Sequence, residues 1–281
     1  MKNICLWILA FLITATAAVY QRMTGPTYPI HGTIVFQGGE IDYRLERSHE
    51  SLQDYHIRIE APNPELRGKV EFKRFKSGDE WSRMPMIREG NDLTAALPHQ
   101  PPAGKLAYRV ILIKQNDEVS LTGDDPVVIR FKGTVPGWVL IPHIIIMFAA
   151  MLFSTRAGIE AFRPKKNPRV LVIWTTGLLF IGGIILGPLV QKFAFGALWT
   201  GFPFGTDLTD NKTLIAMIGW IVALIVGRKD RDARVWVIIA ALLLLAVYLI
   251  PHSLLGSELD YSQPSLDSAR IEAPAPIPIT Q

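Results

Sequence analysis

Four long apolar runs, separated by short loops, are the feature of this sequence that most constrains its fold. They lie near residues 136–155, 170–190, 213–227 and 235–255. A helix needs about 20 mostly apolar residues to cross the hydrocarbon core of a bilayer, and most of these runs are close to that length. We therefore expect a transmembrane domain of four helices over residues 135–256.

A further apolar segment opens the chain. Residues 4–20 carry no charged side chain and follow Lys2. The length fits either a secretory signal peptide or a short membrane anchor. The small-x-small pattern at residues 15–17 resembles a cleavage site, whereas a tryptophan and the length of the apolar core favour an anchor. We expect residues 1–21 to be one or the other, with the chain that follows outside the cytoplasm.

Between these apolar parts, residues 28–134 alternate apolar and polar side chains at the period of a β-strand. Clusters of Gly, Pro, Asn and Asp separate the alternating segments, which lie at residues 33–36, 41–45, 56–59, 69–72, 93–97, 106–113 and 127–131. About seven short strands with such spacing are typical of an all-β sandwich. The sequence therefore predicts an extracytoplasmic β-sandwich at residues 28–134.

One part of this region also suggests a family. Trp81 and the methionines after it precede Leu-Thr-Ala-Ala-Leu-Pro at 93–98 and Pro-Ala-Gly-Lys-Leu-Ala-Tyr at 102–108. These segments resemble the later strands of immunoglobulin-like or fibronectin type III-like domains of bacterial surface proteins. The resemblance covers roughly a third of the chain. It implies a sandwich fold and a docking role, and it implies no catalytic chemistry.

The basic residues indicate how the helices are oriented. The net charge is +4, and the basic residues cluster in the loops after the first and third runs: Arg156, Arg163, Lys165, Lys166 and Arg169, then Arg228, Lys229, Arg231 and Arg234. Lys and Arg concentrate in cytoplasmic loops of membrane proteins, so both clusters are expected inside and nucleic acid is not an expected partner. The β domain and the tail 257–281, which is acidic and then proline-rich, are expected outside, the tail being disordered.

Motifs for known chemistries are missing from the sequence. It has no His-Glu-x-x-His, no phosphate-binding glycine loop and no Gly-x-Ser-x-Gly. The middles of the four runs carry no ionisable residue, which disfavours an ion-coupled transporter. Cys5 is the only cysteine, so an intramolecular disulfide is impossible. These features favour a protein that is not an enzyme.

A repeated tetrapeptide is the first candidate site. Leu-Ile-Pro-His occurs at 140–143 and again at 249–252. Because the two runs cross in opposite directions, His143 and His252 are expected near the same outer surface, each beside a kink or helix end caused by proline. Two such imidazoles suit haem iron or a transition metal. The alternative is that both are ordinary interfacial histidines next to prolines that mark helix ends.

The second candidate is the segment 187–213, which mixes aromatic residues with glycine and proline. It is too apolar for a free loop and too interrupted for a regular helix, so we expect it at the membrane interface or partly re-entrant. Asp207 and Asp210 near its end have two interpretations. One is that Asp207 or Asp210 caps the next helix. The other is an outer pocket, shared with the histidines and formed by Asp207, Asp210, Trp199, Glu258 and Asp260.

The sequence as a whole predicts a multi-pass protein of the bacterial cytoplasmic membrane. The favoured function is a non-enzymatic component without a cofactor, surrounded by the lipid bilayer. Its β-sandwich and aromatic segment would dock a partner outside the cytoplasm, either a protein or the lipid headgroup layer. The alternative is a redox or metal-handling membrane protein that binds haem or a transition metal through His143 and His252.

Overall fold

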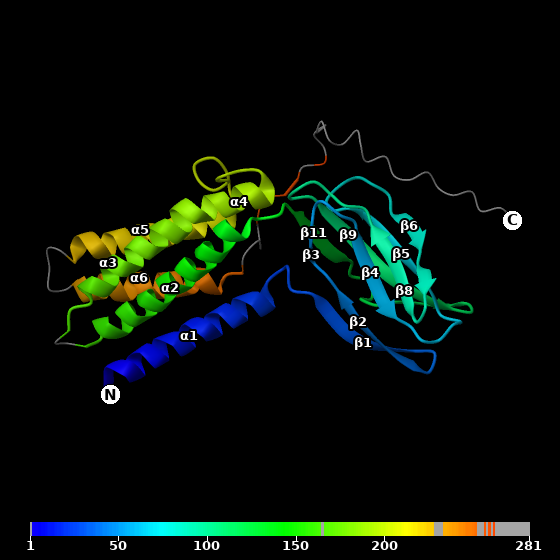
Figure 1. The fold of residues 1–281 in the computed structure, drawn as a ribbon, viewed down its shortest axis with the longest axis horizontal. Coiled ribbons are helices and arrows are strands. Elements are labelled where there is room, and N and C mark those ends of the chain that lie inside the picture. Colours follow the sequence, from blue (N-terminus) through cyan, green and yellow to red (C-terminus); the bar gives the residue numbers. More distant parts are fainter. Residues whose placement is uncertain are drawn as a thin grey trace. The chain divides into compact units, whose positions relative to one another are not determined.

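The fold was analysed in a computed structural model, which describes residues 2–163, 166–227 and 233–251 together with Gly256, Glu258, Leu259 and Tyr261. The chain forms two compact units. The helical unit comprises Met1–Pro29, Glu46–Ser48 and Gly133–Ser257; the β unit comprises Ile30–Leu45, His49–Lys132 and Glu258–Gln281. Along the chain one helix comes first, then the strands, then the remaining helices (Figure 1).

Long apolar helices make up most of the helical unit. They are α1 (Lys2–Thr24), α2 (Gly137–Ala161), α3 (Arg169–Leu179), α4 (Gly187–Phe195), α5 (Leu208–Val226) and α6 (Ala233–Leu249), with a π-helical segment η1 (Phe180–Leu186) between α3 and α4. Four helical stretches are long and apolar enough to cross a membrane: Asn3–Thr24, Gly137–Ala161, Arg169–Phe195 and Leu208–Val226. The expectation of a membrane protein with a β-rich region is therefore confirmed at this level. The last predicted run forms only the shorter apolar helix α6 among the described residues.

Small residues let the helices of this unit pack closely. Helix α2 contacts α1, α3 and α6, and α5 contacts α3 and α6. A methyl group on Gly182 would lie 2.8 Å from the sulfur of Met147 in α2, and one on Gly183 would lie 2.7 Å from Cγ2 of Thr213 in α5. A side chain at either position would force a neighbouring side chain to move, so glycine allows η1 to lie close to α2 and α5.

The β unit contains all seven segments that the alternation predicts, and further short strands. Its strands are β1 (Ile30–Phe36), β2 (Gly39–Leu45), β3 (Ser48–Glu50), β4 (Tyr55–Glu60), β5 (Arg67–Arg74), β6 (Ser82–Pro85), β7 (Ile87–Glu89), β8 (Asp92–Leu97), β9 (Lys105–Lys114), β10 (Asp117–Ser120) and β11 (Val127–Lys132). Strands β3, β6, β7 and β10 were not predicted. Each has only three or four residues, too few to show a clear alternation.

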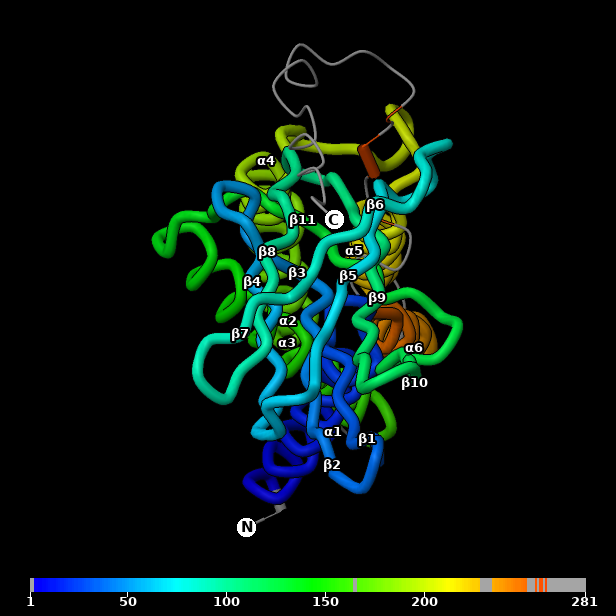
Figure 2. The backbone as a smooth tube through the Cα atoms, turned by 90° about the vertical axis from the view of Figure 1, so that its right-hand side faces the viewer, coloured from blue at the N-terminus to red at the C-terminus, as the bar shows by residue number. Residues whose placement is uncertain are grey.

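The strands form two sheets and a separate hairpin. One sheet has the order β3-β11-β9-β5-β6, with β10 also pairing with β9; the other has the order β4-β8-β7; β1 pairs with β2. Figure 2 shows β5 beside β9 and β4 beside β8. One hydrophobic core takes buried side chains from both sheets, such as Ile57 and Leu97 from one and Val70 and Tyr108 from the other. The sheets are therefore held together by a shared core, in which Tyr108 is fully buried.

Candidate functional site

The aromatic segment between α4 and α5 forms a well-bonded turn. It begins at Gly196, whose φ of 85° ends α4 in the left-handed conformation that glycine tolerates. It ends at Asp207, whose carboxylate accepts a hydrogen bond from the Thr209 amide at 2.7 Å. This is the N-cap arrangement, which satisfies a backbone N–H that has no partner inside the helix. The capping interpretation is therefore confirmed for Asp207.

Asp210 has a different role, because its side chain turns back to the segment before the helix. Its carboxylate accepts hydrogen bonds from the amides of Thr200 at 2.7 Å and of Gly201 at 3.0 Å. The side-chain oxygen of Asn211 accepts one from the amide of Phe202 at 2.6 Å. Three consecutive backbone N–H groups of the turn are thus held by the first turn of α5. A methyl group on Gly201 would lie 2.5 Å from Cβ of Asp210, so glycine is needed for this approach.

The turn fixed in this way presents two phenyl rings outward. Phe202 and Phe204 are 69% and 82% exposed, although the backbone that carries them is hydrogen-bonded throughout. Trp199 lies on the same turn, and its ring N–H donates to the carbonyl of Phe202 at 3.0 Å. The arrangement is an aromatic surface on a preorganised loop, which lowers the entropy lost when a partner binds.

Two side chains donate hydrogen bonds to carbonyl groups at the end of α6. The Lys212 ammonium donates to the carbonyl of Ile250 at 2.7 Å, and the Gln21 amide donates to the carbonyl of Tyr248 at 2.7 Å. The last carbonyls of a helix lack partners inside it and carry partial negative charge, so a buried cation is stabilised there. Lys212, only 4% exposed, is a buried charged residue that the sequence analysis did not single out.

The ring of His143 in α2 is hydrogen-bonded to the π-helical segment η1. Its Nδ1 lies 3.0 Å from the carbonyl oxygen of Gly182. A carbonyl can only accept, so Nδ1 carries the proton and Nε2 is left as an acceptor or metal ligand. His252 lies outside the described residues, so the predicted pairing of the two histidines stays a prediction. Among the residues that the structure describes, no group of three His, Cys, Asp or Glu side chains is placed to hold a metal.

The predicted outer pocket stays a prediction, because its residues fall in two separate units. Asp207, Asp210 and Trp199 lie on or beside one turn of the helical unit. Glu258 belongs to the β unit, where its carboxylate pairs with two lysines. Asp260 lies outside the described residues. The sequence analysis grouped these residues because all of them are expected on one side of the membrane, but an expected side does not specify contact.

The opposite end of the helical unit holds a buried ion cluster that the sequence analysis did not single out. Glu160 lies 2.5 Å from the guanidinium of Arg156 and 3.2 Å from that of Arg163. Arg156 also donates to the side chain of Asn3 at 2.7 Å, and its guanidinium lies 5.5 Å from the ring centre of Trp7. The spacing of Arg156 and Glu160, four residues apart on a helix, was the available signal.

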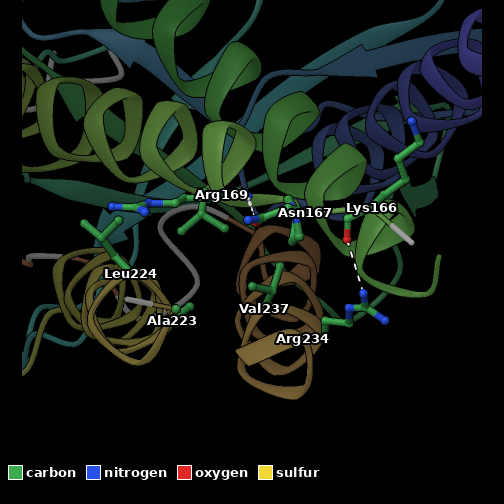
Figure 3. A pocket seen from close by; sticks show the side chains of 10 residues that line it. Lys166, Asn167, Arg169, Ala223, Leu224, Arg234 and Val237 are labelled. Carbon is green, nitrogen blue, oxygen red and sulfur yellow. Dashed lines mark hydrogen bonds between the residues drawn. The ribbon is translucent and has the colours of Figure 1, made fainter. Parts of the chain in front are cut away.

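A cavity of about 200 Å³ lies at the same end, between the ends of α3, α5 and α6 (Figure 3). Lys166, Arg169 and Arg234 are among its lining residues. Their charged groups point in different directions in Figure 3, and Arg234 donates to the carbonyl of Lys166 at 3.4 Å. The cations among the described lining residues do not converge on one point, whereas an anion site needs several donors aimed at one ligand.

Comparison of the chain with protein-family models, with curated proteins and with solved structures gave no match. The immunoglobulin-like resemblance therefore remains an expectation from the sequence. Function has to be inferred from the geometry of the chain itself.

Proposed function

We propose that this protein is a non-enzymatic component of a bacterial cytoplasmic membrane that docks a protein partner outside the cytoplasm. The β unit and the aromatic turn, residues 196–207, each provide a docking surface. The single observation that carries the proposal is the exposure of Phe202 and Phe204 on a backbone fixed by Asp210 and Asn211. Protein interfaces are built around such aromatic anchors.

The distribution of charge supports the proposed orientation. Arg163, Lys166, Arg169 and Arg234 all lie at the end of the helical unit where α2 ends and where α3 and α6 begin. Cytoplasmic ends of membrane helices carry such an excess of Lys and Arg. The aromatic turn follows the other end of α3–α4, which in this orientation faces away from the cytoplasm.

The strand order of the β unit supports a recognition role. It pairs β4 with β8 in one sheet and places β5, β9 and β11 together in the other. This matches the immunoglobulin layout, in which strands B and E share one sheet and C, F and G share the other. Domains with this architecture are common at cell surfaces, so the order agrees with docking, although a fold alone does not establish a function.

Site-specific photo-crosslinking in native membranes tests the proposal. A photoreactive phenylalanine analogue at Phe204 is expected to yield a discrete adduct with a second protein. The same analogue at Trp174, which is 56% exposed on α3 between the two ends, serves as the matched control and is expected to label lipid only. Lipid labelling alone at both positions would show that the turn is an interfacial anchor, and the docking function would be wrong.

Thiol labelling tests the orientation separately. In a Cys5→Ala background, a cysteine at Leu52, which is 75% exposed on the β unit, should react with a membrane-impermeant reagent in cells without an outer barrier. A cysteine at Asn167, exposed beside α3, should react only after the membrane is opened. Labelling of Asn167→Cys in intact cells would reverse the orientation.

Metal or haem binding is the second candidate, and the hydrogen bond of His143 favours it. Histidines that bind metals usually donate their other ring N–H to a carbonyl or carboxylate, as Nδ1 of His143 does to Gly182. The purified protein would then carry stoichiometric metal or a haem absorbance, and His143→Ala and His252→Ala would each abolish it. A colourless wild-type protein without metal would eliminate this candidate.

A further inference from the structure

A corner of the β unit, where β5 ends and β9 begins, holds a short acidic and aromatic segment that follows α6 in the sequence. The segment includes Glu258, Leu259 and Tyr261. The amide of Leu259 donates to the carbonyl of Ala103 at 3.2 Å, which fixes the backbone of the segment against the loop before β9. All of these residues belong to the β unit.

Two lysines hold the carboxylate of Glu258. The ammonium groups of Lys76 and Lys105 donate to its two oxygens at 2.7 and 2.6 Å. The side chain of Lys105 is only 14% exposed, and burial lowers the pKa of its ammonium even though Glu258 acts in the other direction. Charge-assisted bonds of this length are among the stronger hydrogen bonds in proteins, so the contact is specific for an anion.

The phenol of Tyr261 occupies a separate part of the same corner. Its hydroxyl accepts from the amide of Lys105 at 2.9 Å and lies 3.1 Å from the side-chain oxygen of Gln100, to which it donates. Gln100 is itself buried. A methyl group on Gly104 would lie 2.9 Å from this hydroxyl, so glycine makes room for the phenol.

Arg74 completes the phenol site by covering the ring. Its guanidinium lies 5.0 Å from the ring centre of Tyr261, within the range of a cation–π contact. Asp79 fixes that guanidinium with two hydrogen bonds of 2.5 and 2.8 Å. The corner therefore binds two chemical groups of the chain's own tail, a carboxylate and an aromatic hydroxyl, which lie three residues apart in the sequence.

We propose that this corner is a recognition site for an acidic and aromatic peptide segment, and that Glu258 and Tyr261 of the chain's own tail are its resident occupant. The inference rests on the proposed docking function, because a partner segment that carries the same two groups binds by displacing the tail. The tail therefore competes with the partner segment, which must bind tightly enough to displace it. A tethered segment competes at an effective concentration that is typically about millimolar.

Peptide binding to two forms of the chain in detergent tests the proposal. One is the full chain; the other ends at Ser257 and so leaves the corner open. The probe is a fluorescent peptide with the sequence of residues 256–264, followed by anisotropy. We expect the shortened chain to bind the peptide and the full chain to bind it at least about tenfold more weakly, because its own tail competes.

Matched peptides show whether the two groups are recognised. A peptide with Glu258→Gln loses the ionic bonds, and one with Tyr261→Phe loses the hydroxyl bonds; each should bind about tenfold more weakly or worse. These variants cannot unfold the protein, because the change is in the probe. Equal binding of all three peptides, no binding by the shortened chain, or equal binding by both chains would overturn the proposal. None of these results depends on crosslinking at Phe204, so the docking function can fail or stand separately.

Discussion

The two ends of the helical unit both bury ionised side chains, but they stabilise these charges in different ways. At the end where α2 terminates, the guanidinium groups of Arg156 and Arg163 share the carboxylate of Glu160. At the end where α5 begins, Asp210 and Lys212 are buried without an ion pair between them among the described residues. Asp210 is satisfied by backbone N–H groups and Lys212 by a backbone carbonyl.

The difference indicates what each end does. An ion cluster fixes helices to one another, because removing one charge leaves the other buried and uncompensated. A carboxylate bound to consecutive backbone amides instead fixes the shape of a loop, because those amides would otherwise lack partners. The first end therefore holds the helices together, whereas the second shapes the turn that carries Phe202 and Phe204.

The largest loss of stability is expected from Glu160→Ala. This variant leaves Arg156 buried without its carboxylate, and breaking a buried pair in this way costs about 3–5 kcal/mol. Unfolding of the purified protein in mixed micelles, followed as SDS is added, measures the loss.

The double variant Arg156→Met with Glu160→Leu is the matched control. It removes both charges and fills the space with apolar side chains, so it should recover most of the loss of stability. A Glu160→Ala variant as stable as the wild type would show that water reaches this end, and the contrast between the two ends would disappear.

Asp210→Ala is expected to cause the next largest loss of stability. It leaves the amides of Thr200 and Gly201 without their acceptor, at a cost of about 3 kcal/mol for the pair. The change should also loosen the aromatic turn, which limited proteolysis between Gly196 and Asp207 would detect.

Asp207→Ala provides the comparison within the same turn. It removes the helix cap, which is worth about 1 kcal/mol, and should leave the turn resistant to protease. Equal cleavage in both variants would mean that Asp210 has no special role in shaping the turn.

The main elements of both units were predictable from the sequence, because their signals are local. Alternation located the seven longer strands between Ile30 and Lys132, and hydropathy located the apolar helices. The π-helical turn at Phe180–Leu186 left no such signal, since it depends on packing around Gly182 and Gly183. In the candidate sites, too, a local feature such as the helix cap at Asp207 can be predicted from the sequence. Contacts between residues far apart in the sequence, such as Glu258 with Lys105, cannot.

The two ends also make different contacts with α1, which leads to a prediction about processing. Asn3 bonds to Arg156 at one end, and Gln21 bonds to the carbonyl of Tyr248 at the other. Cleavage after Ala17 would remove Asn3 and Trp7 and expose Arg156. We therefore expect the mature protein to retain α1, with an intact mass that includes residues 2–17.

The stability that the contacts of α1 contribute can be measured with Asn3→Ala. Loss of one hydrogen bond to a buried guanidinium should cost about 1.5 kcal/mol in the SDS titration. Gln21→Ala removes a bond to a neutral carbonyl and should cost about 1 kcal/mol or less. An intact mass that begins after Ala17 would contradict the prediction.

The smallest loss of stability is expected at an exposed ion pair on the β unit. Comparison with the buried pair at Glu160 shows how much burial contributes to the stability that an ion pair provides. Arg74 and Asp79 make two hydrogen bonds, but their side chains are 40% and 31% exposed. Water screens exposed pairs, so Asp79→Asn should cost less than about 1 kcal/mol at pH 7.

The effect of Asp79→Asn should also depend on pH in a defined direction. The hydrogen bonds from Arg74 hold the pKa of the Asp79 carboxyl below its ordinary value of 3.8, although partial burial opposes them. A carboxyl whose pKa is lowered by folding stabilises the protein above its unfolded pKa, and this contribution is lost as the pH falls through the folded value. The wild type should therefore unfold at a higher temperature than Asp79→Asn at pH 7, and the difference should shrink below pH 3.8. A difference that grew on acidification would mean that Asp79 is protonated in the folded protein, and that its bonds to Arg74 are not ionic.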